Sequence, residues 1–89
     1  MVRRELEIVN RLGLHARAAS RFVQLAARFR CEVRLRHGGQ EANGKSILGV
    51  MRLAAARGAR LELLTEGPDE EAAAEALAAL VAGRFGEPE

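Results

Sequence analysis

The sequence predicts an α+β fold of the two-layer, open-faced sandwich type, in which helices cover one face of a single sheet. Two observations support it. Stretches in which apolar and polar residues alternate, typical of strands with one buried face, are interleaved with stretches that have the apolar spacing of helices. The order is strand, helix, strand, strand, helix, strand, helix, so all helices must cover the same apolar face. We expect the 89 residues, 1–89, to form a single domain.

The first half of the chain contains three of the expected strands. Residues 2–9 alternate, with Leu6 and Ile8 on one side, and are followed by a helix expected over 16–29. The apolar face of this helix comprises Ala19, Phe22, Val23, Ala26 and Ala27. Strict alternation over 31–36 predicts the second strand. A glycine-containing turn then predicts a hairpin with a short return strand over 41–43.

The second half begins with Ser46, a favoured N-cap residue, which we expect to start a helix closed by residues 57–59. A fourth strand is predicted over 60–65. The third helix follows residues 67–71, which supply a breaker, a cap candidate and acidic residues that complement the helix dipole. We expect residues 86–89 to form a frayed tail.

Charge is unevenly distributed along the chain. Residues 1–60 carry thirteen Lys and Arg against four Glu, a balance of +9, whereas residues 61–89 carry one Arg against eight Asp and Glu, a balance of −7. This pattern is either a segregated solvated surface or a basic face for an acidic partner or a phosphorylated site. Nucleic acid is a weaker candidate, because single-strand platforms use aromatic side chains and the chain has only three Phe and no Trp or Tyr.

A cytoplasmic location is expected from three features. Cys31 is the single cysteine, so an intramolecular disulfide and cysteine-pair metal sites are excluded. The first residues lack the apolar core of a signal peptide. No apolar run approaches the ~20 residues of a membrane span, and we expect no membrane association.

Residues 13–19, Gly-Leu-His-Ala-Arg-Ala-Ala, lie where a strand-like run ends and a helix begins. A helix N-terminus presents unpaired N–H groups and a partial positive charge, and it therefore stabilises an anion. A phosphoryl group on His15 would be held by the backbone N–H groups of Ala16 and Arg17, and the Arg17 guanidinium would add donors. From spacing alone, however, a histidine here is more often a surface cap, and Arg17 is more often a solvated residue.

The segment Ile8–Arg17, Ile-Val-Asn-Arg-Leu-Gly-Leu-His-Ala-Arg, resembles the active-site signature of HPr, the histidine-containing phosphocarrier family of the bacterial phosphotransferase system. The segment Lys45–Met51 is similar to the regulatory-serine motif of that family, and the likeness covers nearly the whole chain. The resemblance implies four antiparallel strands in the order 1-4-2-3 under three helices, with the phosphate on Nδ1 of His15. The family usually has proline where this chain has Ala18, and some nitrogen-regulatory relatives are similar at this position.

The resemblance also implies a function. A phosphocarrier of this family accepts a phosphoryl group on His15 from phosphorylated Enzyme I and passes it to IIA domains in the phosphoenolpyruvate-dependent phosphotransferase system. Such a relay is a stoichiometric carrier and not an enzyme, and we expect a monomer without cofactor or metal. The alternative from the residues alone is a non-transferring regulatory module, or one that binds an anion or nucleic acid through its basic half.

Ser46 has two interpretations. The pattern makes it an N-cap, and the resemblance adds regulatory phosphorylation by the bifunctional HPr kinase/phosphorylase in organisms that have one. Ile47, Leu48 and Met51 can belong to the core, but Leu48 lies off the face that carries Val50. We therefore expect exposed apolar surface beside Ser46, suited to docking a transient partner.

The segment Gly39–Ser46 fits the P-loop pattern G-x-x-x-x-G-K-[ST], but we reject a nucleotide site there. A P-loop requires a parallel sheet whose strand leads directly into the loop, together with a carboxylate for magnesium. Here the residues between the glycines read as a hairpin and a short strand, and the only aspartate, Asp69, is a helix-cap candidate. His37 is expected to be a turn residue, since two distant histidines supply too few ligands for a metal.

Overall fold

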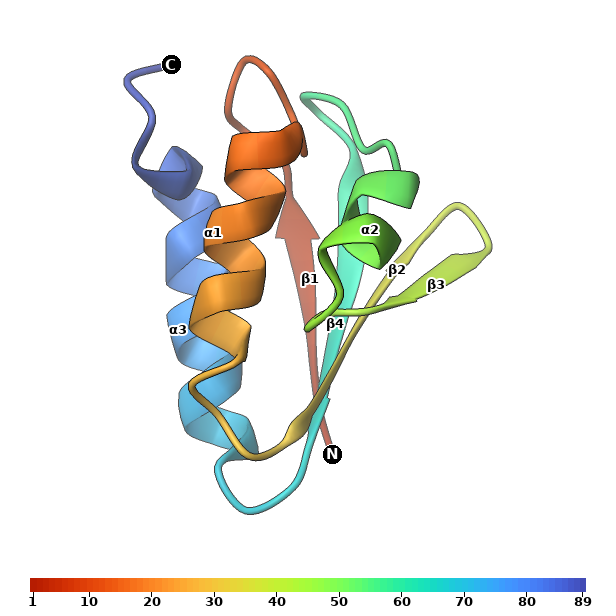
Figure 1. The fold of residues 1–89 in the computed structure, drawn as a ribbon, viewed down its shortest axis with the longest axis vertical. Helices are drawn as coiled ribbons and strands as arrows, with labels where there is room; N and C mark the ends of the chain where they lie inside the picture. The colour runs from red at the N-terminus through yellow and green to blue at the C-terminus, as the bar shows by residue number, and fades with distance from the viewer.

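A four-stranded antiparallel sheet carries three helices on one face in the computed structural model, which describes residues 1–89 (Figure 1). The elements are β1 (Val2–Glu7), α1 (Ala16–Ala26), β2 (Glu32–His37), β3 (Gln40–Asn43), α2 (Ile47–Arg52), β4 (Arg60–Glu66) and α3 (Glu70–Ala82), followed by the 3₁₀ turn η1 (Arg84–Gly86). The expected fold class and element order are confirmed.

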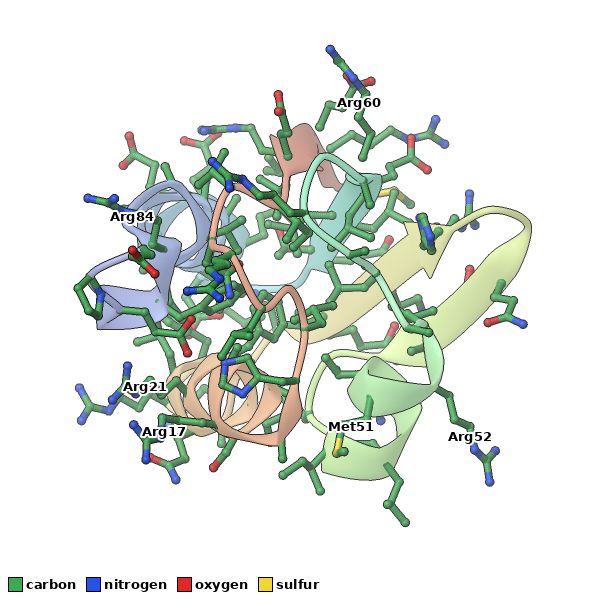
Figure 2. All side chains as sticks on the ribbon, turned by 90° about the horizontal axis from the view of Figure 1, so that it is seen from above. Arg17, Arg21, Met51, Arg52, Arg60 and Arg84 are labelled. Atoms are coloured by element: carbon green, nitrogen blue, oxygen red, sulfur yellow. The ribbon has the colours of Figure 1, made fainter.

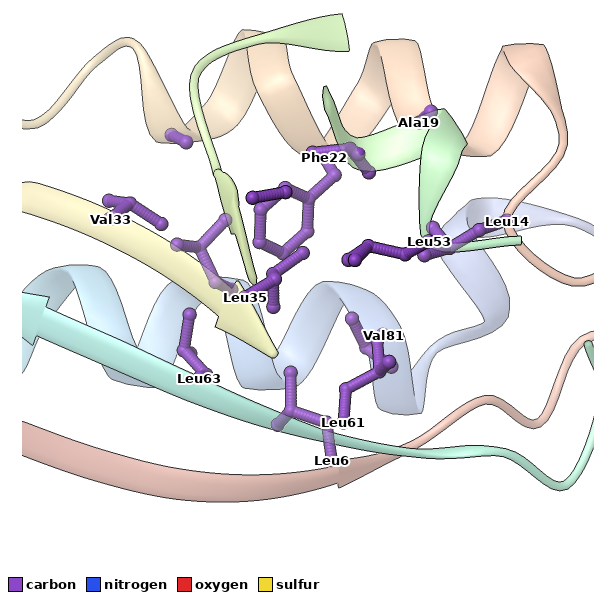
Figure 3. Packing of buried hydrophobic residues seen from close by; sticks show 14 of the residues in the cluster. Leu6, Leu14, Ala19, Phe22, Val33, Leu35, Leu53, Leu61, Leu63 and Val81 are labelled. Carbon is purple, nitrogen blue, oxygen red and sulfur yellow. The ribbon is translucent and has the colours of Figure 1, made fainter. Parts of the chain in front are cut away.

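The strands lie in the order β1-β4-β2-β3, as the family resemblance implied. The register places Leu6 opposite Leu61 and Leu35 opposite Leu63, so the apolar residues of neighbouring strands share the face beneath the helices. Helix side chains complete the core, with Phe22 of α1 and Val81 of α3 almost fully buried (Figure 3). Small residues in these helices let them pack closely on the sheet, namely Ala18, Ala19, Ala73 and Ala74.

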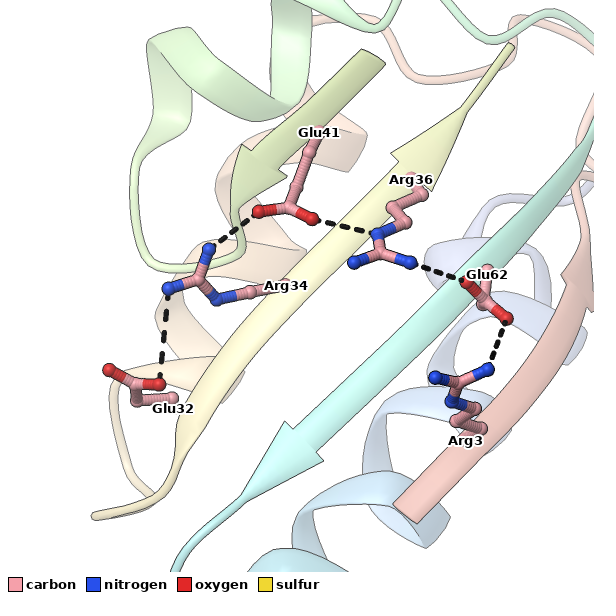
Figure 4. A network of polar contacts seen from close by, with 6 residues as sticks. All are labelled: Arg3, Glu32, Arg34, Arg36, Glu41 and Glu62. Carbon is pink, nitrogen blue, oxygen red and sulfur yellow. Dashed lines mark hydrogen bonds and ion pairs between the residues drawn. The ribbon is translucent and has the colours of Figure 1, made fainter. Parts of the chain in front are cut away.

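The other face of the sheet carries ion pairs between neighbouring strands (Figure 4). Arg36 of β2 lies opposite Glu41 of β3 and Glu62 of β4, with N···O distances of 2.7 and 3.4 Å. Arg34 pairs with the same Glu41 at 2.5 Å, and Arg3 of β1 reaches Glu62 at 3.9 Å. These side chains are solvated, so each pair adds little stability, but together they neutralise most of the positive charge on this face.

Two helices are shorter than predicted. α1 ends at Ala26 and not at residue 29, because the N–H groups of Arg28 and Phe29 bond three residues back and tighten the chain into a turn. α2 ends at Arg52, well before residues 57–59. Ala54 adopts the left-handed conformation, with φ of 50°, and turns the chain so that the Ala55 carbonyl accepts the Leu14 N–H at 2.9 Å. The early end of α2 therefore fixes the loop that precedes α1.

Asp69 precedes α3, but its side chain does not cap that helix. Its two carboxylate oxygens accept the backbone N–H groups of Arg30 and Cys31, at 2.8 and 2.9 Å. The hydrogen bond from the Arg30 N–H is the main reason that the pKa of the Asp69 carboxyl lies below its ordinary value. Asp69 thus ties the connection between α1 and β2 to the start of α3.

The tail over 86–89 differs from the frayed segment that we expected. Arg84, Phe85 and Gly86 all have positive φ, of 60°, 54° and 81°, and this reverses the chain after α3. The buried Phe85 ring and a hydrogen bond from Arg21 to the Phe85 carbonyl oxygen hold the reversal in place. The tail then returns to the end of the molecule that holds the N-terminus of α1 (Figure 1). There Glu89 pairs with Arg11, both backbone to backbone at 3.0 Å and side chain to side chain at 2.9 Å.

Gly67→Ala is expected to destabilise the fold more than Gly58→Ala. Both glycines have positive φ, of 145° and 89°, so either alanine is strained. A Cβ at Gly67 would lie 2.7 Å from the Cα of Cys31, whereas a Cβ at Gly58 meets nothing within 4 Å. We therefore expect an additional loss of about 1–3 kcal/mol for Gly67→Ala, measured as the difference in free energy of unfolding by urea. Equal losses in the two variants would contradict the clash.

Candidate functional site

His15 is the N-cap residue of α1. Its backbone is extended, with φ of −73° and ψ of 177°, and its carbonyl oxygen accepts the Ala19 N–H at 2.9 Å. Its ring turns back over the first turn, where Nδ1 accepts the Arg17 N–H at 3.3 Å. The side chain is 28% exposed. One ring nitrogen of a partly exposed histidine therefore faces the positive end of a helix, as the sequence predicted.

The loop before His15 is fixed by short contacts. Gly13 has φ of 68°, and a Cβ there would lie 2.5 Å from the Ala55 carbonyl oxygen, so no other residue fits without a shift. Leu14 is buried, and its N–H is bonded to that same carbonyl. The side-chain amide of the fully buried Asn10 donates to the Gly13 carbonyl at 2.8 Å. These contacts hold the backbone that carries the His15 ring.

Glu87 of the returning tail contacts the other ring nitrogen of His15, with its Oε2 on Nε2. Its Oε1 accepts the Asn10 side-chain amide at 2.9 Å, and the Glu87 side chain is only 11% exposed. Burial by itself raises the pKa of the Glu87 carboxyl, but the hydrogen bonds from Asn10 and His15 outweigh it and hold this pKa below its ordinary value. The carboxyl is therefore an ionised acceptor at neutral pH.

The partners of His15 assign the ring proton. Nδ1 accepts a backbone N–H and so carries no hydrogen, whereas Nε2 faces a carboxylate and must donate. The lone pair of Nδ1 therefore carries no proton and points at the N-terminus of α1, where it accepts the Arg17 N–H. The sequence alone did not choose between the two nitrogens. The geometry favours Nδ1 as the nucleophile.

Arg17 and Arg21 have different surroundings, although both lie on α1. The Arg17 guanidinium is exposed and has no hydrogen-bond or ion-pair partner in the structure, so it is free to bind an anion beside His15. The Ala16 N–H has no backbone partner either. The Arg21 guanidinium, in contrast, donates to the Phe85 carbonyl. An open groove runs beside this cluster between residues 11–17 and the tail residues 87–89.

Ser46 is the N-cap of α2, and its Oγ accepts the Gly49 N–H at 3.2 Å. The three apolar residues expected beside it are exposed: Ile47, Leu48 and Met51. Leu48 is 67% exposed, and only Val50 of α2 is buried. α2 packs against α1, and Figure 2 shows Met51 and Arg17 along the same side of the molecule. The His15 and Ser46 motifs therefore form two clusters on neighbouring helices.

Sequence reasoning missed three residues around the site. Leu12 is 66% exposed beside His15 and extends the apolar surface. Asn10 and Glu87 are far apart in the chain, and no periodicity connects them with His15. The available signal was the acidic character of the tail after a strongly basic first half.

The rejected P-loop segment runs through the hairpin turn, β3 and the cap of α2 in an antiparallel sheet. His37, which we expected in the turn, is instead the last residue of β2, and its Nδ1 is 3.3 Å from the Arg60 carbonyl oxygen. The structure holds no group of three or more His, Cys, Asp or Glu side chains placed to bind a metal. None of its helices combines the length and the apolar character needed to span a bilayer.

Comparison with known proteins agrees with this geometry. Residues 2–83 match the family model described as PTS HPr component phosphorylation site. The phosphocarrier protein HPr of Cupriavidus necator is 49% identical over 89 residues, which cover 100% of both chains. A crystal structure of HPr from Thermoanaerobacter tengcongensis superposes with a TM-score of 0.96 at 40% identity, again over 100% of both chains. A crystal structure of an HPr dimer from the same organism has a TM-score of 0.79 at 43% identity, over 92% of this chain and 94% of that one.

The His15 ring places its Nδ1 at a helix N-terminus. The family model matches nearly the whole chain, and a relative of 49% identity matches its full length. Together these findings assign the chain to one family. The chain belongs to the HPr family, the phosphocarrier proteins of the phosphotransferase system.

Proposed function

We propose that His15 accepts a phosphoryl group through Nδ1 from phosphorylated Enzyme I and passes it to IIA domains of the phosphoenolpyruvate-dependent phosphotransferase system. The observation that carries this proposal is the position of Nδ1, 3.3 Å from the Arg17 N–H at the N-terminus of α1. The family match supports Enzyme I and IIA domains as the two protein partners. Both transfers require an exposed nucleophile on a rigid surface, and the His15 loop supplies one.

The chemistry follows from the ring and its surroundings. The Nδ1 lone pair attacks phosphorus in line with the bond that breaks, and the same nitrogen later becomes the leaving group. The transferring group carries negative charge on its oxygens. The backbone N–H groups of Ala16 and Arg17 and the Arg17 guanidinium lie where they can stabilise that charge. The N–H that Nδ1 now accepts becomes a donor to the phosphoryl group once the Nδ1–P bond has formed.

A carrier is favoured over an enzyme because the site is an exposed side chain beside an open groove and has no enclosed substrate pocket. Each phosphoryl group accepted on His15 must be handed on before the next is taken. We place this relay in the cytoplasm and expect it to act as a monomer. Assignment to the nitrogen-regulatory branch remains a prediction that rests on Ala18.

The exposed residues Ile47, Leu48 and Met51 are proposed as the docking surface for partner proteins. They lie on α2, next to the helix that carries His15, so one partner can cover both clusters. Ser46 lies at the edge of this surface. A phosphate on Ser46, added by an HPr kinase/phosphorylase in a host that has one, would be tolerated by α2 but would place negative charge at the edge of the docking surface.

The alternative, an anion- or nucleic-acid-binding module, is not favoured. Such a module needs free basic side chains on one surface, but Arg34, Arg36 and Arg60 on the sheet all pair with glutamates. The free guanidinium of Arg17 lies instead beside the one histidine at a helix N-terminus.

His15→Ala is expected to abolish phosphoryl acceptance and to leave the fold intact, because the ring is partly exposed and outside the core. The variant is incubated with Enzyme I and phosphoenolpyruvate, and the added phosphate is measured by intact mass. Acceptance at the wild-type rate would rule out His15 as the acceptor. A melting curve that matches wild type serves as the control for folding.

Arg17→Ala should slow acceptance by a factor of ten or more, as the loss of a charge-stabilising donor typically does. The matched control is Arg28→Ala, since Arg28 is also exposed but lies beyond the C-terminal end of α1. Arg21→Ala is a poorer control, although Arg21 also lies on α1, because its guanidinium donates to the Phe85 carbonyl. Equal rates for the Arg17 and Arg28 variants would show that general positive charge, and not a placed donor, assists the transfer.

Ser46→Asp should weaken docking to Enzyme I without unfolding the protein. The new carboxylate lies at a helix N-terminus, where it stabilises by ~0.3–1 kcal/mol, but it adds negative charge at the edge of the docking surface. We expect a raised apparent KM for phosphorylation that is partly relieved by salt. Ala72→Glu adds the same charge on α3, which lies on the other side of α1 from α2 (Figure 1), and should leave the KM unchanged. A large loss of Tm in Ser46→Asp would show that Ser46 matters only as a cap.

A further inference from the structure

Glu87 is held against His15 from two directions. Its Oε2 contacts Nε2 of the ring, and its Oε1 accepts the Asn10 amide at 2.9 Å. Asn10 is fully buried and also donates to the Gly13 carbonyl in the loop that carries His15. The carboxylate and the ring are therefore fixed by the same buried side chain.

The tail itself is anchored at both ends of this contact. On one side, the left-handed turn over 84–86 is held by the buried Phe85 ring and by the guanidinium of Arg21. On the other side, Glu89 is bonded to Arg11 through backbone and side chain. Glu87 lies between these anchors with a side chain that is 11% exposed. The fold therefore holds Glu87 in place, since the side chain of an unanchored surface glutamate would be solvated.

We propose that Glu87 is a positioning residue for the phosphoryl carrier, which keeps the ring proton on Nε2 and stabilises the ring cation while Nδ1 carries the phosphoryl group. This role rests on the proposed function of His15. It has no counterpart in the sequence motif, because Glu87 lies 72 positions from His15.

The proton balance of the transfer shows what Glu87 contributes. The neutral ring carries its hydrogen on Nε2, and the Nδ1 lone pair forms the bond to phosphorus as the bond to the donor breaks and the donor takes that electron pair. The ring then has a substituent on both nitrogens and a positive charge. When the phosphoryl group leaves for the acceptor, the electron pair of the Nδ1–P bond returns to Nδ1. The Nε2 hydrogen remains in place throughout, so no proton has to be transferred.

The positive charge that develops on the ring lies directly against the Glu87 carboxylate in a partly buried contact, and a hydrogen bond between opposite charges is stronger than a neutral one. The phosphoryl group binds the opposite nitrogen, beside Arg17. Glu87 therefore does not occupy the place of the phosphoryl group, and the ring cation separates the two anions. An ionised carboxylate in this position acts through the ring and not on phosphorus.

The test compares Glu87→Gln with Glu75→Gln. Both variants remove one negative charge, but Glu75 is exposed on α3 and its side chain contacts neither His15 nor the tail. We expect Glu87→Gln to slow phosphoryl acceptance from Enzyme I about tenfold, whereas Glu75→Gln retains the wild-type rate. Melting curves of both variants check that the fold is retained.

A second measurement separates positioning from a general structural role. Nitrogen-15 NMR of the ring at one near-neutral pH reports the Nε2 hydrogen. In wild type and Glu75→Gln we expect a slowly exchanging Nε2–H before phosphorylation and a ring that still carries it afterwards. In Glu87→Gln we expect faster exchange and a smaller protonated fraction of the phosphorylated ring. Identical ring spectra and acceptance rates in the two variants would overturn the role of Glu87.

The outcomes also distinguish this inference from the proposed function. Failure of the wild-type protein to accept a phosphoryl group would remove the function and this role with it. Acceptance by wild type at a rate that Glu87→Gln matches would leave the carrier function intact and would refute the positioning role alone.

Discussion

Burial of a single sheet face beneath three helices is the constraint on which the rest of this structure depends. Because the strands alternate, Leu35 and Leu63 face the helices while Arg36 and Glu62 face water. All helices must lie on one side, and this places α1 with its N-terminus at the edge of the layer, where His15 is partly exposed. The core is what gives the site a rigid base.

The alternation and the helical spacing allowed every strand and helix to be predicted, because the face that each residue occupies can be read from local order. The ends of α1 and α2 were not predicted, since they depend on long-range contacts. Ala54 leaves the helical conformation so that the Ala55 carbonyl can accept the Leu14 N–H. No local pattern encodes that hydrogen bond, although it fixes the loop before His15.

The same division holds for the site. His15, Arg17 and Ser46 stand at helix starts, which spacing can locate, but their roles were expected from the family resemblance. Glu87 could not be predicted, because the tail returns through three residues of positive φ and only Gly86 among them favours that conformation. Burial of Phe85 compensates for the strain of the other two. The sequence shows an acidic tail, but only the fold shows which of its carboxylates meets the histidine.

The segregation of charge along the chain is partly offset within the molecule. Acidic residues of the last third pair with basic groups of the first part, from the N-terminal amine with Glu70, at 3.0 Å, to Arg11 with Glu89. Glu62 binds both Arg3 and Arg36 on the open face of the sheet. Of the thirteen basic side chains in residues 1–60, five pair with a carboxylate, namely Arg3, Arg11, Arg34, Arg36 and Arg60. Arg17 differs from these arginines because its guanidinium remains without a partner next to His15.

A phosphoryl carrier must bind its cargo well enough to accept it and weakly enough to release it. Donors at the N-terminus of α1 and the free Arg17 guanidinium favour acceptance. The Glu87 carboxylate attracts the ring cation, but it also repels the phosphoryl oxygens across the width of one imidazole. The attraction of the ring cation and the repulsion of the phosphoryl oxygens partly offset one another. Because the ring keeps its Nε2 hydrogen in both states, the exchange needs neither proton transfer nor rearrangement of the site, and the same geometry serves arrival and departure.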